Sequence, residues 1–397
     1  MDDDIWRLPG PSRMVAETVR EVTRGRHTAV VLPAVLGDDR DFVSGLTSSL
    51  TTALWAANEY PRRVTTDEED ADPLAWLAQA LDVDESPLST SRLLDHDEAA
   101  GKTAVFDCTP LHPKLRHDVA DTVTRLVTES RPRPAEHRPR LLLVCTRDAL
   151  PRLGADHTDV TFEALWWWGR LTRWDVAAQI QQTIEARSEP GVLRDVRLET
   201  LIEVCRWDIR LATALAGGWD GDPDVLPALI DDVAAPAAAK CPPVRLARNS
   251  GRRPTGDLVD YWDIGAVDLW HDECVPAVRS ATDRAKAMRH AIWAAQARVL
   301  LPWIETRRQA VAADLLRARG KTAVHSVIGD ASDVLEVGPL FIAVKALSGR
   351  NRPGLRDAVY LLWQARNKLA HLQALTTNEQ RDLVTAFAGI NLEPGKG

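Results

Sequence analysis

The sequence predicts an α/β domain with a parallel sheet at the N-terminus, a helical extension, and an all-α helical bundle at the C-terminus. Three short runs are continuously apolar, as strands buried on both faces of a parallel sheet are: TAVVLP (28–33), TAVFDC (103–108) and RLLLVC (140–145). Helical patterns separate these runs, and alternating strands and helices indicate an α/β layer. From residue 162 onward the apolar spacing is helical, which predicts the bundle.

The elements follow in order along the chain. FVSGLTSSLTTALWAA (42–57) and LRHDVADTVTRLVTES (115–130) have helical spacing, and RPRPAEHRPR (131–140) is typical of a surface loop before the third strand. FEALWWWGRLTRWDVAAQIQQTIEAR (162–187) is interpreted as a helix. Its tryptophans, 166–168 and 174, are expected to pack between layers, with stacking on nucleic-acid bases as the alternative.

Composition shifts divide the chain into four parts. Residues 1–185 form the α/β domain and 186–235 the helical extension. Residues 236–258 lose periodicity and gain proline, alanine and arginine, which indicates a linker. Residues 259–397 form the bundle, with a long helix expected over 287–317 and no set of strands.

The overall composition is that of a globular protein, with 397 residues, 45% of them hydrophobic and 27% charged. No apolar run of about 18 residues predicts a membrane span, and the acidic start MDDDIWRLPG is unlike a signal peptide. We therefore expect a cytoplasmic protein. The five cysteines form no CxxC pair, so reduced and mostly buried thiols are expected, without a disulfide framework or zinc site.

Charge is distributed unevenly along the chain. Between Glu59 and Glu98 there are 12 acidic and 3 basic residues, whereas between Val275 and His325 there are 10 basic and 3 acidic ones. Solvated helix faces explain either run, and the basic run is also typical of a nucleic-acid surface.

A phosphate-binding loop is missing where a parallel sheet would place it. The segment after the first strand, LPAVLGDDRDF, lacks the GK[ST] motif, and its acidic side chains would repel a triphosphate. The tripeptide Gly101-Lys102-Thr103 precedes a strand instead of following one, and Asp107 ends that strand. Residues 10–185 thus resemble the P-loop NTPase superfamily with a degenerate phosphate loop. This resemblance implies an inactivated module, for which we expect no cofactor, and the missing phosphate loop disfavours ATP hydrolysis.

Two acidic motifs do not predict a metal site. WDGDPD (219–224) has the spacing that begins an EF-hand loop, but Val225 replaces the glycine at position six. We interpret it as a turn that breaks a helix. HDEC (271–274) has no second ligand pair at metal spacing.

The run YLLWQARNKLAH (360–371) places three polar residues directly after an apolar helix. Asn367 and His371 are four residues apart and share one helix face, and Arg366 is adjacent. Histidine exchanges protons near neutral pH, and the arginine fork matches a phosphate. The three side chains are expected to meet at the edge of a groove beside the core, or across an interface with a second copy.

Arg366, Asn367 and His371 resemble the R-N-xxx-H signature of the HEPN superfamily, whose all-helical domains include metal-independent endoribonucleases. The resemblance covers about the last 140 residues and needs no cofactor. It implies that His371 acts as general acid or base, that Arg366 holds the scissile phosphate and that Asn367 supports them. It also implies a homodimer that joins two such helices. RNA would contact the preceding basic residues Arg307, Arg308, Arg317 and Arg319.

The expected function is that of a ribonuclease toxin or phage-defence effector, restrained by an N-terminal domain that binds a trigger or a protein partner. The alternative is a non-catalytic HEPN subunit of a defence or signalling complex, in which the bundle dimerises or docks a partner.

Overall fold

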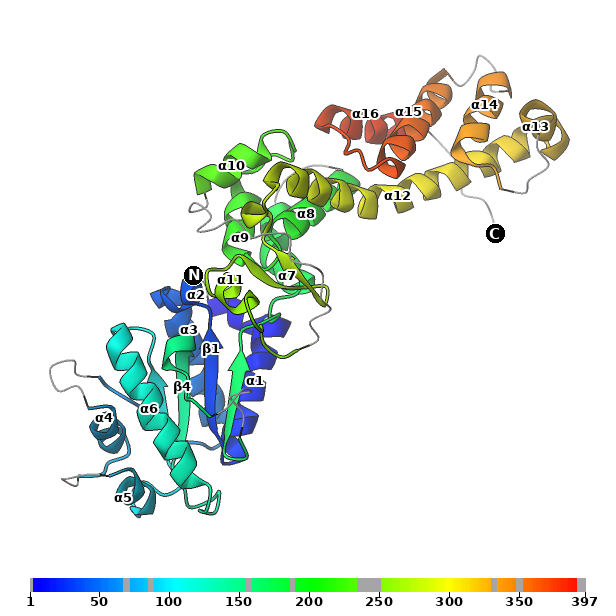
Figure 1. Ribbon diagram of the computed structural model, residues 1–397. Coiled ribbons are helices and arrows are strands. Elements are labelled where there is room, and N and C mark those ends of the chain that lie inside the picture. The colour runs from blue at the N-terminus through cyan, green and yellow to red at the C-terminus, as the bar shows by residue number, and fades with distance from the viewer. Residues whose placement is uncertain are drawn as a thin grey trace. The chain divides into compact units, whose positions relative to one another are not determined.

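The computed structural model describes residues 3–66, 72–84, 89–153, 159–185, 190–233, 251–329, 334–347 and 353–390 (Figure 1). The chain forms two compact units. The α/β unit comprises Met1–Asp175 and Ala238–Ala277, and the helical unit comprises Val176–Ala237 and Val278–Gly397. Each unit is described by itself below.

The α/β unit contains a five-stranded parallel sheet in the order β2-β3-β4-β1-β5. Its strands are β1 (His27–Leu32), β2 (Pro61–Arg63), β3 (Thr103–Asp107), β4 (Arg140–Thr146) and β5 (Phe162–Trp166). Every residue of β1 is buried, as expected for a central strand covered on both faces. The three predicted strands are confirmed as β1, β3 and β4.

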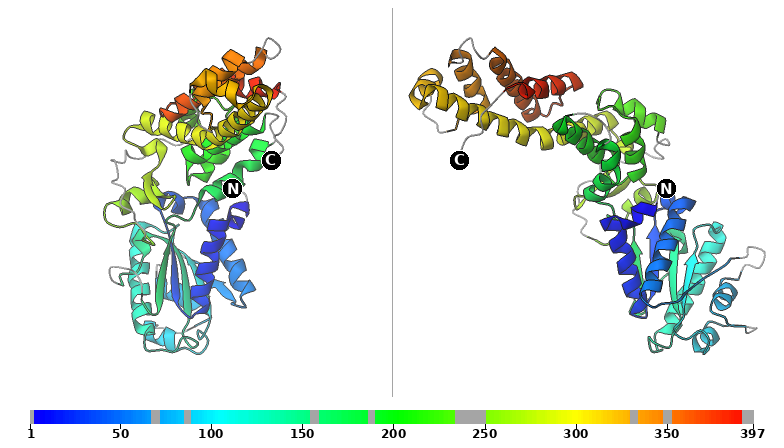
Figure 2. Two further views of the ribbon diagram at one scale, coloured as in Figure 1. Left: turned by 90° about the vertical axis from the view of Figure 1, so that its right-hand side faces the viewer. Right: turned by 180° about the vertical axis from the view of Figure 1, so that it is seen from behind.

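Helices cover both faces of this sheet (Figure 2). The chain runs from β1 to β2 through α3 (Arg40–Ala56) and from β3 to β4 through α6 (Pro113–Ser130), and these two connections cross the sheet in opposite directions. Because both crossovers are right-handed, α3 and α6 lie on opposite faces of the sheet. The helix α1 packs beside α3. The helices and short 3-10 turns up to residue 149 are η1 (Asp3–Arg7), α1 (Pro9–Thr23), α2 (Ala34–Gly37), α3 (Arg40–Ala56), α4 (Pro73–Ala80), α5 (Thr90–Asp95), α6 (Pro113–Ser130) and η2 (Arg147–Ala149).

A later segment of the chain returns to the α/β unit. It consists of α11 (Leu258–Asp263) and an antiparallel hairpin of β6 (Val267–Trp270) and β7 (Glu273–Pro276). The buried Asp268 accepts hydrogen bonds from the backbone N–H groups of Gly169 (2.8 Å) and Leu269 (2.7 Å). Residues 259–277 therefore belong to the α/β unit, although the sequence placed them in the bundle.

The helical unit is built around one long helix, α12 (Arg284–Arg319), which includes the predicted 287–317. Its core joins apolar residues of α12, α14, α15 and α16, among them Leu300, Leu340, Leu362 and Leu383. The other elements are α7 (Arg173–Glu185), α8 (Gly191–Cys205), α9 (Ile209–Gly218), α10 (Leu226–Val233), η3 (Val278–Ser280), α13 (Lys321–Ile328), α14 (Val337–Leu347), α15 (Pro353–Ala370) and α16 (Thr377–Ala388). The helices from 191 to 233 thus belong to the same unit as α12–α16. The expected linker begins in 236–250, which lies outside the described residues.

The prediction of a helix from residue 162 is wrong for its first part. Residues 162–166 form β5, which pairs in parallel with β1, and the helix begins only at Arg173. The packing expected of the tryptophans holds for three of them, since Trp166, Trp167 and Trp168 are buried, whereas Trp174 is 66% exposed.

The cysteines follow the expectation where they are described. Cys108, Cys145, Cys205 and Cys274 are free and buried, and burial raises the pKa of the first three thiols. Cys241 lies outside the described residues.

Candidate functional site

The R-N-xxx-H motif lies at the carboxyl end of α15, and its asparagine and histidine lie on the face opposite the core. At about 100° per residue, the buried Leu355, Leu362 and Leu369 mark one side of the helix. Asn367 and His371 fall on the other side, in line with Tyr360. Asn367 is half-buried, whereas Arg366 and His371 are exposed. By the same rule Arg366 falls about 100° from Asn367, toward the side of Leu362 and Leu369, so only Asn367 and His371 share the outward face.

The side chains of this trio make no hydrogen bond or ion pair with the described residues. The expected support of His371 by the Asn367 side chain is therefore absent from this state. Only the backbone is held, because the His371 N–H donates to the carbonyl oxygens of Asn367 and Lys368 at 3.1 Å. Leu372 then takes a left-handed conformation (φ 59°) and ends the helix.

Buried polar side chains fix the segment that follows His371. The Gln296 amide donates to the Leu375 carbonyl oxygen (2.9 Å) and accepts from the Leu375 N–H (2.6 Å). Gln380 donates a second hydrogen bond to the same carbonyl, at 3.1 Å. The Trp293 indole N–H donates to the Leu369 carbonyl oxygen at 2.7 Å, which ties α12 to the last turn of α15. These contacts place the motif beside the first third of α12.

A cleft of about 930 Å³ lies between the start of α12, the segment after His371 and the turn before α10. Its lining includes residues 372–376 together with Lys286, Arg289 and His290. These three side chains are exposed, and the His290 ring lies 5.3 Å from the Trp293 ring. The sequence placed them within a basic run, but only the fold brings them near residue 371.

The four arginines expected to bind RNA lie elsewhere on α12. At about 1.5 Å per residue, Arg307 and Arg319 are roughly 20 and 40 Å along the helix from Trp293. Arg307 lies over the Trp303 ring, at 5.3 Å. Arg308 is buried, pairs with Glu305 and donates to the Leu335 carbonyl oxygen, so it supports the fold. Arg317 is half-exposed and lies 3.9 Å from Asp314.

Glu305, an acidic residue on the same helix as these arginines, is also remote from the motif. Hydrogen bonds from Arg308 and Gln309 lower the pKa of its carboxyl group to about 2. Glu305 therefore serves as the partner of Arg308 on the outer side of α12.

In the α/β unit, the chain itself fills the carboxyl edge of the sheet. The Asp263 carboxylate of α11 accepts a hydrogen bond from the Ala34 N–H directly after β1, at 2.8 Å. A Cβ on Gly37 would lie 2.5 Å from the Thr146 side chain, so this segment packs closely on β4. Asp107, at the end of β3, accepts from both the N–H and the hydroxyl of Thr109. The carboxyl groups of Asp263 and Asp107 are thus engaged by protein donors.

The two acidic motifs form turns. In WDGDPD, Asp220 and Asp222 each accept a hydrogen bond from the backbone N–H two residues later, as predicted for a turn. His271 and Asp272 form the two-residue turn of the β6–β7 hairpin. The described residues contain no group of three or more His, Cys, Asp or Glu side chains placed to hold a metal ion.

Within the same described residues, none of the helices combines the length and the apolar character that a membrane span requires. A comparison of the chain with protein-family models, curated proteins and solved structures finds no match.

Proposed function

We propose that the helical unit is a HEPN-type endoribonuclease that cleaves RNA without a metal ion. The observation that carries this proposal is the outward face of α15, where the side chains of Asn367 and His371 lie four residues apart and have no hydrogen-bond or ion-pair partner among the described residues. Lys286, Arg289 and His290 line the adjoining cleft, and the first two supply positive charge for an RNA backbone.

The chemistry requires little more than proton transfer. The 2′-hydroxyl of RNA attacks the neighbouring phosphate, so the protein has to remove one proton, supply another and stabilise the charge on phosphorus. His371 is exposed and can exchange protons with the substrate. Arg366 is adjacent, and its planar guanidinium can hold two phosphate oxygens.

The α/β unit would then be a regulatory domain that resembles a P-loop NTPase without its phosphate loop. Support for this comes from the carboxylate of Asp263 at the segment after β1, where a phosphate would otherwise approach the backbone. A trigger or a protein partner would act through this unit.

The test is cleavage of total RNA by the full chain in EDTA. The wild type should produce new ends, and Arg366→Ala combined with His371→Ala should lower the rate by about 100-fold or more, as expected for loss of acid–base catalysis. Arg381→Ala and His117→Ala, exposed residues of α16 and α6, are the matched controls. Equal cleavage by the double variant would show that the nuclease site lies elsewhere.

The second candidate function is a non-catalytic dimerisation or docking subunit. Its supporting observation is the aromatic cluster on the same side of α15, where Tyr360 is 39% exposed and Trp363 stacks on Phe341 at 5.9 Å. Such a face suits contact with a second copy. If the cluster is a dimer interface, Tyr360→Arg should convert a dimer to a monomer in light scattering, whereas Arg381→Ala should not. If no RNA is cleaved by the wild type, this function is favoured.

A further inference from the structure

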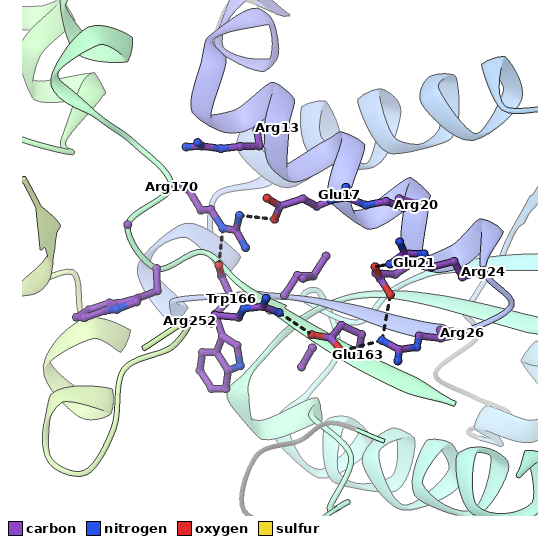
Figure 3. A pocket seen from close by; sticks show the side chains of 14 residues that line it. Arg13, Glu17, Arg20, Glu21, Arg24, Arg26, Glu163, Trp166, Arg170 and Arg252 are labelled. Atoms are coloured by element: carbon purple, nitrogen blue, oxygen red, sulfur yellow. Dashed lines mark hydrogen bonds and ion pairs between the residues drawn. The ribbon is translucent and has the colours of Figure 1, made fainter. Parts of the chain in front are cut away.

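A second cleft, of about 570 Å³, lies in the α/β unit between α1 and the outer side of β5 (Figure 3). This volume is typical of small-molecule sites. Among the described residues β5 pairs with one neighbour, β1, so its other side faces the cleft. Asp263 and the segment after β1 do not line it, so this cleft is distinct from the filled carboxyl edge.

The charged lining of the cleft carries an excess of positive charge. Glu17 pairs with Arg170 at 2.6 Å, and Glu21 pairs with Arg24 and Arg26 at 2.6 and 3.0 Å. The third carboxylate, Glu163, pairs with Arg26 at 3.1 Å and lies 3.8 Å from Arg252. The three glutamates of the lining are therefore already neutralised, and the lining contains six arginines. These are Arg13, Arg20, Arg24, Arg26, Arg170 and Arg252.

Two of these arginines have no carboxylate partner among the described residues. Arg13 and Arg20 are exposed side chains of α1, seven residues apart, which places their backbones roughly 10 Å apart along the helix. Figure 3 shows them on the same helix, on either side of the paired Glu17. Two separated guanidinium groups can each take a separate anionic group of one ligand.

Besides these two arginines, the lining of the cleft contains two further hydrogen-bond donors without a partner among the described residues. Trp168 lines the cleft, is 4% exposed, and its indole N–H finds no acceptor among the described residues. The backbones of Thr161 and Trp167 form hydrogen bonds with β1. In a strand, the N–H and carbonyl groups of successive residues point alternately to the two neighbouring sides, so the N–H and carbonyl of Ala164 point away from β1, toward the cleft. The cleft thus offers unused donors, whereas its carboxylate acceptors are occupied.

We propose that this cleft binds a small ligand that carries at least two phosphate groups, held mainly by Arg13 and Arg20. A phosphate supplies several acceptor oxygens and no donor when fully ionised, and arginine binds it with two parallel hydrogen bonds. A ligand with two or more phosphates would also balance the excess charge. The α/β unit then has a ligand site of its own, independent of RNA cleavage by the helical unit.

The experiment is isothermal titration of the full chain in EDTA, with inorganic tripolyphosphate and ATP as separate ligands. Arg13→Gln combined with Arg20→Gln should weaken the binding of both ligands by about tenfold or more, because two charge-assisted contacts are lost. Arg40→Gln combined with Arg152→Gln, exposed arginines outside the cleft, is the matched control and should bind as the wild type does. Raising the salt concentration should weaken binding in the wild type and the control alike.

The two ligands identify the source of the phosphate. Equal affinities would indicate recognition of phosphate alone, and tighter binding of ATP would indicate contacts with the nucleoside as well; both results support the site. Two results would overturn it: no binding of either ligand at millimolar concentration, or unchanged binding by the Arg13/Arg20 variant.

Discussion

Gln296 holds the segment after His371, and replacing it by methionine tests how that segment is fixed. The side chain is 1% exposed and bonds to both backbone groups of Leu375, which is itself 1% exposed. Methionine has a similar length and no amide, so Gln296→Met removes both hydrogen bonds with little change in volume. The Leu375 N–H loses its partner, whereas the carbonyl oxygen keeps Gln380.

The expected loss of stability follows from these contacts. Two hydrogen bonds contribute about 1 kcal/mol each, and a buried N–H without a partner costs about 1–3 kcal/mol, part of which is already counted in its lost bond. Gln296→Met should therefore lower the free energy of unfolding by about 3 kcal/mol. Gln380→Met removes one bond to a carbonyl that Gln296 still satisfies, so its cost should be about 1 kcal/mol.

Thermal unfolding and hydrogen exchange of the full chain measure both effects. A unit of this size loses about 2–4 °C in Tm per kcal/mol, so Gln296→Met should lower the transition of the helical unit by roughly 6–12 °C. The Leu375 amide should also exchange faster in Gln296→Met than in Gln380→Met. Equal transitions and equal exchange in the two variants would refute the role assigned to Gln296.

Two predictions concern buried titratable groups of the α/β unit. Burial raises the pKa of Asp268 to about 7, so the folded state holds more protons than the unfolded state between about pH 4 and 7, and stability falls as pH rises through that window. Asp268→Asn should match the wild type at pH 4 and be more stable by up to about 4 kcal/mol at pH 8 in urea unfolding, whereas equal stabilities at pH 8 would contradict the burial argument. Burial also lowers the pKa of His27 to about 3, so stability should be lost as pH falls from about 6.5 toward 3. Because His27 accepts from the Leu141 N–H and contacts the Ser130 hydroxyl, His27→Gln can keep both partners and should flatten this acid dependence in the same assay.

The strands that the sequence predicted are those whose environment is uniform. β1, β3 and β4 are buried on both faces, so their continuous apolar runs are distinctive. β2 lies at the edge of the sheet and has the sequence Pro-Arg-Arg. An edge strand is exposed to water and needs no apolar pattern, so this strand could not be recognised from the sequence. β5 was taken for a helix because FEALWWW is apolar up to Gly169, and the break before α7 carries no proline.

The hairpin and the division into units were missed for related reasons. His271 and Asp272 adopt φ values of 54° and 61°, as a tight two-residue turn requires, but neither is the glycine or asparagine that usually reveals such a turn. The hairpin returns to the α/β unit through Asp268 and Gly169, which are 99 residues apart in the sequence. Local patterns carry no information about contacts at that separation.

The candidate site also has one part that could be predicted from the sequence and one part that could not. The face shared by Asn367 and His371 follows from helical periodicity alone, so it could be predicted. The contacts of Trp293 and Gln296 with residues 369 and 375 span 76 and 79 positions, so the adjoining cleft could not. The arginine count along α12 was a poor guide, because buried Arg308 serves the fold while exposed Lys286 and Arg289 line the cleft.

The filled carboxyl edge limits where the α/β unit can receive a ligand. A phosphate placed after β1 would have to displace the Asp263 carboxylate from the Ala34 N–H. It would also disturb α11, whose Trp262 is 1% exposed and packs 5.3 Å from Trp166. Because a buried indole contributes several kcal/mol of packing, displacing it would oppose most of the binding energy of a phosphate group. The cleft beside β5 requires no such displacement, since Arg13 and Arg20 already lie at the surface, so a phosphate ligand of this unit should bind there first.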